Sequence, residues 1–136
     1  MAIKGKMNAG KLTIGTQGTR DSKLTLGNGS AELVHKATGL EMSAGGTVEV
    51  TASSTLELAA LSGNVGSITG AGALKLTDAN GRFGGSISSN LTYAGGDSGT
   101  YTLSQTFSGS KLKVESGALT LVGGLTAASV TLTQEA

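Results

Sequence analysis

The residues best suited to catalysis in this chain could form a serine nucleophile with a histidine base. The segment Gly96-Asp-Ser-Gly99 matches the loop around a nucleophilic serine, and His35, Asp78 and Ser98 follow one of the chain orders of such a triad. A fold with this order needs two β-barrels, which 136 residues cannot supply with a full core. The residues beside His35 also lack the pattern that surrounds such a base. We therefore expect an ordinary turn at Ser98, an isolated histidine and no enzyme.

Binding of a metal ion is the second chemistry to consider. One histidine and no cysteine leave mainly oxygen ligands, which suit Ca²⁺. Asp78-Ala-Asn-Gly81 and Gly95-Gly-Asp-Ser98 resemble fragments of calcium-binding turns, but neither has the repeated Asp or the closing Glu of a complete site. Asp and Asn at such positions also form Asx turns, in which the side chain bonds to nearby backbone. We expect Asx turns here, with no metal ligand, no cofactor and no catalytic residue.

Length and composition limit the class of protein to which the chain can belong. With 136 residues and 13.3 kDa, we expect one domain over residues 1–136. The chain has no cysteine for disulfides, and its net charge of +1 argues against a nucleic-acid partner. No apolar run approaches the length of a membrane span. The 23 glycines suggest disorder, but an apolar fraction of 38% with near-zero net charge indicates a folded chain.

Apolar dyads with one intervening residue recur along the whole chain. This period of two is typical of a strand with one buried face, and the intervening residues are mostly Thr, Lys or Glu. Turn-forming residues interrupt the chain at roughly 8–12 residue intervals, the spacing of an all-β protein with short strands. The dyads are Leu12/Ile14, Leu24/Leu26, Leu40/Met42, Val48/Val50, Leu56/Leu58, Leu74/Leu76, Leu91/Tyr93, Tyr101/Leu103, Leu112/Val114, Leu119/Leu121 and Val130/Leu132.

Among all-β architectures, the composition favours a β-solenoid of parallel, stacked coils. Nearly every backbone N–H in such a stack bonds to a neighbouring coil, and the chain has no proline. Only four aromatic residues occur, and we expect large rings to fit poorly in a narrow coil. At ~20 residues per coil, the chain makes about six or seven coils. A β-sandwich or jelly roll is the alternative, since its strands show the same period of two.

Two short phrases each occur twice with small changes. Lys11-Leu-Thr-Ile-Gly15 is followed by Lys23-Leu-Thr-Leu-Gly27, and Gly72-Ala-Leu-Lys-Leu76 by Gly117-Ala-Leu-Thr-Leu121. We interpret them as a degenerate structural repeat, although a composition dominated by Gly, Leu, Thr, Ala and Ser produces such echoes as well. The second pair, with residues 86–93 and a Gly-Gly turn between its copies, resembles the repeats of bacterial autotransporter passengers. The resemblance covers about residues 63–126 and implies a right-handed parallel β-helix outside a bacterium.

The formal charge changes sign within the first sixty residues. The first forty carry six cations and two anions, a balance of +4, and Glu41, Glu49 and Glu57 follow with no cation between them. An ordinary solvated surface is the expected interpretation of this pattern. The alternative is head-to-tail contact between copies, in which the positive end of one meets the negative region of the next.

Because no group of polar residues converges on a reaction, we expect a noncatalytic structural or surface protein that self-associates. Unpaired strand edges or solenoid ends would join copies of the chain into a filament, sheath or array. One alternative is an extracellular adhesin or autotransporter passenger fragment with a host or cell-surface ligand, and another is a capsid or fibre subunit of a virion. We expect an extracellular or cell-surface location, or a virion, although the N-terminal residues lack the apolar region of a signal peptide.

Two segments are the candidates for assembly. Residues 1–8 belong to no dyad and are expected to form an extended N-terminal arm, whereas residues 129–134 are expected to form the last strand. Either segment would complete the sheet of a neighbouring copy. The residues expected in these contacts are Met1, Ile3, Lys4, Lys6, Val130 and Leu132.

Overall fold

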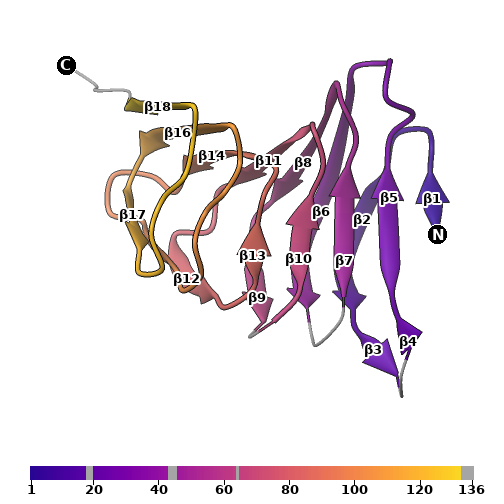
Figure 1. Ribbon diagram of the computed structural model, residues 1–136, viewed down its shortest axis with the longest axis horizontal. Coiled ribbons are helices and arrows are strands. Elements are labelled where there is room, and N and C mark those ends of the chain that lie inside the picture. The colour runs from indigo at the N-terminus through magenta and orange to yellow at the C-terminus, as the bar shows by residue number, and fades with distance from the viewer. Residues whose placement is uncertain (18–19, 43–45, 64, 133–136) are drawn as a thin grey trace.

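The chain forms a parallel β-solenoid of about six turns, which confirms the expected fold class over the sandwich alternative. The computed structural model describes residues 1–17, 20–42, 46–63 and 65–132, and these residues form no helix. The coils follow one another along the longest axis of the molecule (Figure 1). The first coil therefore lies at one end of the solenoid, and the last described strand lies at the other end.

Each coil runs along three sides of the solenoid, and the strands of each side pair in parallel. The first side consists of β1 (Ala2–Ile3), β5 (Lys23–Leu26), β7 (Thr47–Val50), β10 (Ser67–Thr69) and β13 (Ser86–Ile87). The second side consists of β2 (Asn8–Ile14), β6 (Leu33–Met42), β8 (Ser54–Leu58), β11 (Ala73–Leu76), β14 (Asn90–Ala94), β16 (Lys111–Ser116) and β18 (Ser129–Leu132). The third side contains β9 (Leu61–Gly63), which pairs with the end of β6, and then β12 (Asn80–Phe83), β15 (Thr100–Leu103) and β17 (Ala118–Leu121).

A short hairpin departs from this parallel arrangement between the first and second coils. Its strands, β3 (Thr16–Gln17) and β4 (Arg20–Asp21), pair antiparallel and project beyond the coils (Figure 1). All other pairings between named strands in the described part of the chain are parallel. The hairpin therefore adds length to one coil without changing the register of the coils around it.

Inward-facing side chains stack in columns because neighbouring strands pair in register. One column passes through six coils at spacings of 17 to 21 residues, close to the predicted coil length. All eleven predicted dyads lie within strands, and most of their apolar side chains are buried. The members of this column are His35, Leu56, Leu74, Leu91, Leu112 and Val130.

The expectation that large rings fit poorly inside the coil is wrong. Every aromatic ring of the chain is buried, and glycines on the same coil or on a neighbouring coil leave the space that the rings occupy. A Cβ atom at Gly95 would lie 2.1 Å from the Tyr93 hydroxyl, and one at Gly81 would lie 2.9 Å from the Tyr101 ring. The buried rings belong to Phe83, Tyr93, Tyr101 and Phe107.

The repeated phrases do not mark the period of the solenoid. Gly72-Ala-Leu-Lys-Leu76 enters β11 on the second side, whereas Gly117-Ala-Leu-Thr-Leu121 enters β17 on the third side. The two lysine-led phrases likewise fall on different sides, in β2 and β5. The repeated phrases therefore mark similar starts of strands that follow turns. The period of the solenoid is instead visible in the columns of inward-facing side chains.

Candidate functional site

The structure does not bring together the three residues that resemble a catalytic triad. His35 is buried on β6, where its ring nitrogens contact Met7 and Ser54. Asp78 bonds to backbone on the third side, and Ser98 is exposed in a turn between β14 and β15. His35 and Asp78 therefore bond to other groups, and no hydrogen bond among the described residues joins any two of the three. The arrangement gives no support to a nucleophilic serine.

His35 acts as a buried hydrogen-bonding link near the N-terminal end of its column. Its Nδ1 atom accepts a hydrogen bond from the Met7 N–H at 3.1 Å, so this nitrogen carries no proton. The proton therefore resides on Nε2, which lies 3.3 Å from the hydroxyl oxygen of Ser54. Burial lowers the pKa of His35 below its ordinary value of 6.5, which favours the same neutral form.

Asp78 organises a turn on the third side. Its Oδ1 atom accepts a hydrogen bond from the Asn80 N–H at 3.0 Å, as expected for an Asx turn. Its Oδ2 atom accepts a bond from the Leu61 N–H of the preceding coil. Desolvation, together with the negative charge of Asp78, raises the pKa of the buried Tyr93 and Tyr101 hydroxyls above 10.0. In the described residues, no three acidic or histidine side chains gather as a metal site would require.

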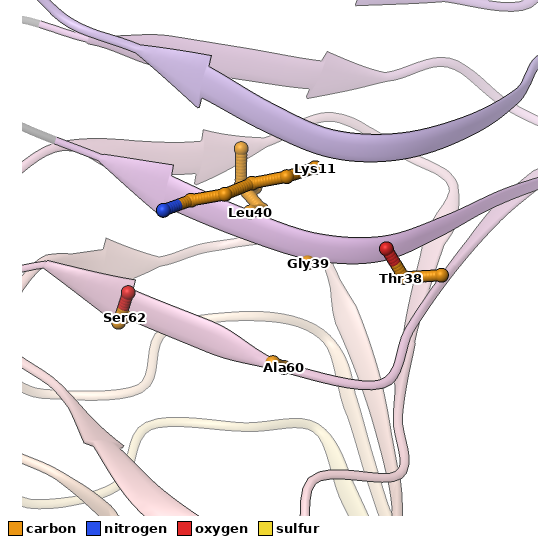
Figure 2. A pocket seen from close by; sticks show the side chains of 6 residues that line it. All are labelled: Lys11, Thr38, Gly39, Leu40, Ala60 and Ser62. Carbon is orange, nitrogen blue, oxygen red and sulfur yellow. The ribbon is translucent and has the colours of Figure 1, made fainter.

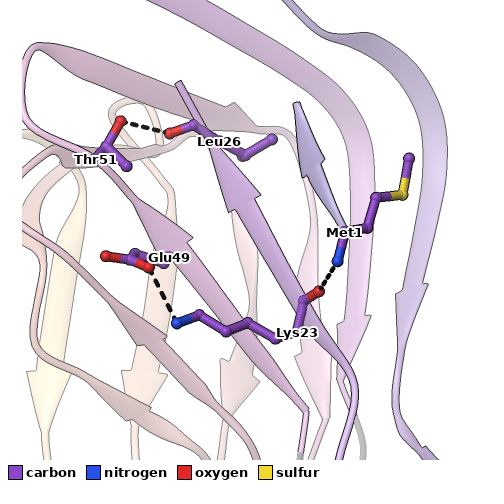
Figure 3. A network of polar contacts seen from close by, with 5 residues as sticks. All are labelled: Met1, Lys23, Leu26, Glu49 and Thr51. Atoms are coloured by element: carbon purple, nitrogen blue, oxygen red, sulfur yellow. Dashed lines mark hydrogen bonds and ion pairs between the residues drawn. The ribbon is translucent and has the colours of Figure 1, made fainter. Parts of the chain in front are cut away.

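Pairing between successive coils explains part of the charge pattern of the first sixty residues. Lys11 lies 3.0 Å from Glu41. Lys23 lies 3.1 Å from Glu49 (Figure 3). Both pairs are largely exposed and contribute little to folding. Cations and anions that are separated in the sequence thus meet within one molecule, which favours the solvated-surface interpretation over attraction between copies.

A shallow groove follows the outer bend between the second and third sides. It encloses about 350 Å³, and the small residues Gly39 and Ala60 form its floor (Figure 2). The Lys11 ammonium at its rim is already paired with Glu41, and no aromatic residue contributes a stacking surface. The groove can therefore accommodate a contact, but its lining offers no convergent set of catalytic groups.

The most distinctive surface is the C-terminal end of the described solenoid, which we call the open end. It comprises β17, β18 and the residues that join them. Large apolar side chains reach solvent here, and three of them continue inward columns, since Leu125 pairs with Phe107, Val130 with Leu112 and Leu132 with Val114. Among the described residues, β18 is the last strand of its sheet. Single exposed apolar residues are ordinary, but a cluster at an unpaired sheet edge is typical of an interaction site. The exposed fractions are 68% for Val122, 45% for Leu125, 47% for Val130 and 74% for Leu132.

The N-terminal end of the solenoid differs from the open end. Within residues 1–8, the segment expected to form an extended arm, Ala2 and Ile3 pair with Thr25 and Leu26 of β5 in the same chain. The amino group of Met1 also bonds to the Lys23 carbonyl at 3.0 Å (Figure 3). This pairing satisfies one edge of β1 within the same chain, and only its outer edge is available to another copy.

The predicted assembly residues therefore fall at both ends of the solenoid. Met1, Lys4 and Lys6 are exposed and Ile3 is half-buried at the N-terminal end, while Val130 and Leu132 are exposed on β18 at the open end. Residues 133 and 134 of the expected C-terminal strand lie outside the described residues. The exposure of Val122 and Leu125 was not predicted, because neither belongs to a dyad.

Comparison with known proteins adds no relative to these observations. The chain matches no family model, no curated protein and no solved structure. Among the described residues, no helix has the length and apolarity needed to cross a membrane. The fold and the two ends of the solenoid are therefore the basis on which a function can be argued.

Proposed function

We propose that this protein is a noncatalytic structural subunit that self-associates through the ends of its solenoid into a filament or array. The observation that carries the proposal is the open end, where Val130 and Leu132 continue two buried columns into solvent. Copies of the chain are the partners, and the proposal places the resulting polymer on a cell or virion surface. The absence of cysteine and the many backbone hydrogen bonds between coils suit such an exposed structural role.

Two physical effects favour association at this end. Burial of apolar surface stabilises a contact by about 25 cal/mol per Å² removed from water, before the cost of association is subtracted. Among the described residues, no strand pairs with the outer edge of β18, and its backbone N–H and C=O groups can pair with a strand of another copy. Both contributions favour a contact at this edge. A second copy of the chain can provide it, because the other terminal strand of the same sheet, β2, is available for pairing.

The proposal is tested by electron microscopy and analytical ultracentrifugation at high protein concentration. The wild-type chain should polymerise, whereas a double variant Val130→Lys and Leu132→Lys should remain monomeric, because charge at the contact opposes its desolvation. The control is Val65→Lys, which places the same side chain at another exposed valine, 40% accessible and between β9 and β10, away from both ends of the solenoid. This control should polymerise like the wild type.

Two outcomes would contradict the proposal. A wild-type protein that stays monomeric at every concentration would favour the adhesin or passenger alternative, in which a ligand and not a second copy is bound. Polymers that persist unchanged in the Val130→Lys and Leu132→Lys variant would show that association uses another surface.

A further inference from the structure

We infer that copies join head to tail, with β18 of one copy pairing in parallel with β2 of the next and Thr131 lying beside Asn8. This inference rests on the proposed self-association and specifies its polarity and register. β18 and β2 are the two terminal strands of the same sheet. A second copy placed beyond β18 in the same orientation therefore continues that sheet without a change in strand direction.

The register follows from which side chains face inward. Val130 and Leu132 continue inward columns, and the inward positions at the start of β2 are Met7, which directly precedes the strand, and Ala9 within it. Pairing of Thr131 with Asn8 places the two apolar residues of β18 beside these two positions. A shift of two residues would instead place Leu132 beside the exposed Lys11, and a shift of one would turn the apolar residues outward.

Side-chain size and charge agree with this register. The inward column that ends at Leu132 begins at Ala9 and Ala37, so its first two rungs hold small side chains. A large exposed leucine of one copy thus meets a rung with room for it. On the outer face, the neutral pair Thr131 and Asn8 separates Lys113 of one copy from Lys36 of the next, which limits like-charge repulsion.

The competing arrangement is a closed dimer in which two open ends meet about a two-fold axis. The β18 strands would then run antiparallel, and the first side of one copy would face the third side of its partner. The first and third sides consist of strands that differ in number and length, so they would not pair with each other across the junction. In the closed dimer only the strands of the second side would pair from one copy to the other. Head-to-tail stacking keeps every side in line, which is why the geometry favours an extending polymer.

Cysteine crosslinking tests the register directly, because the chain has no cysteine of its own. Neighbouring strands lie about 4.8 Å apart, so thiols at paired positions are within the reach of a short thiol–thiol crosslinker. The test variant combines Asn8→Cys with Thr131→Cys. The matched control combines Gly10→Cys with Thr131→Cys; a Cβ at Gly10 meets no atom within 4 Å, so this substitution adds no clash.

The expected result is a ladder of covalent oligomers for the test variant and at least a tenfold lower yield for the control and for each single variant. If the single variant Thr131→Cys crosslinked efficiently but formed only dimers, this result would overturn the inference in favour of the closed dimer. Sedimentation of the uncrosslinked protein separates the two proposals. Polymers without a ladder refute this register alone, whereas monomers refute self-association and the register together.

Discussion

The Nδ1 atom of His35 lies 3.1 Å from the backbone nitrogen of Met7 and accepts its hydrogen bond. This bond ties the start of β2 to β6, since the Lys36 N–H bonds in turn to the Met7 carbonyl. Met7 is 7% exposed and covers the N-terminal end of the core. The single histidine of the chain therefore holds the strand that we propose receives the next copy.

The first prediction concerns the pH dependence of stability. Burial lowers the pKa of His35 in the folded protein, so the unfolded chain binds a proton more readily. As the pH falls through 6.5, the unfolded state gains protons first and the free energy of unfolding decreases. Protonation would also give Nδ1 a hydrogen that opposes the Met7 N–H. Thermal unfolding between about pH 7.5 and about pH 5 should show a falling Tm.

The control for this prediction is His35→Leu, since leucine occupies the next four rungs of the column. This variant should be less stable at neutral pH, because the Met7 N–H loses its acceptor. Its Tm should, however, change less than that of the wild type over the same pH range. An equal fall of Tm in both proteins would assign the pH dependence to the carboxylates instead.

The second prediction concerns the glycines that make room for rings and neighbouring backbone. A Cβ at Gly109 would lie 2.0 Å from the Ser89 carbonyl oxygen and 2.7 Å from the Phe107 ring. Gly109→Ala should therefore lower the free energy of unfolding by about 1–3 kcal/mol, because backbone must shift to relieve the overlap. Gly10→Ala meets nothing within 4 Å and should be neutral in the same urea titration. Equal stabilities of the two variants would refute this account of the packing.

These glycines show where prediction from the sequence succeeds and where it ends. The dyads predicted the strands, because alternation of inward and outward residues is a local property of the backbone. The position of Gly81 beside Tyr101 depends on the pairing of β12 with β15, which links residues twenty positions apart. A ring and the gap that receives it are therefore recognisable only once the coil length at that point is known.

The candidate site was predictable to a similar extent. Val130 and Leu132 were expected at an assembly contact because they form the last dyad, and the structure places them on the terminal strand of a sheet. The strand at Ala2–Ile3 was not predicted, since β1 is too short to show a period of two. Its pairing with β5 arises from the register of the first coils, which a two-residue strand does not reveal.

The third prediction concerns the buried tyrosine hydroxyls. Tyr101 donates a buried hydrogen bond to the Leu61 carbonyl forty residues earlier, and Tyr93 donates a partly buried one to the Asp78 carbonyl at 2.8 Å. Tyr101→Phe should cost about 1–3 kcal/mol, because the Leu61 carbonyl remains buried without this donor. Tyr93→Phe should cost less, because water can reach its partner. Urea unfolding of both variants measures the difference, and a larger cost for Tyr93→Phe would contradict the burial of the two bonds.

The fourth prediction separates folding from assembly along one column. Leu76 and Leu132 occupy the same inward column, but Leu76 is fully buried and Leu132 is 74% exposed. Leu76→Ala should lower the free energy of unfolding by about 2–5 kcal/mol, because it leaves a cavity between coils. Leu132→Ala should change the stability of the monomer by less than about 0.5 kcal/mol, as expected for an exposed side chain.

The same two variants should behave in the opposite way in a sedimentation assay of assembly. Leu132→Ala should weaken polymerisation because the truncated side chain no longer fills the space beside Ala9 of the next copy. Folded Leu76→Ala, examined below its Tm, should polymerise like the wild type because its open end is unchanged. If Leu132→Ala destabilised the monomer as much as Leu76→Ala did, the residue would be part of the folded core. The open end would then not be a surface that awaits a second copy.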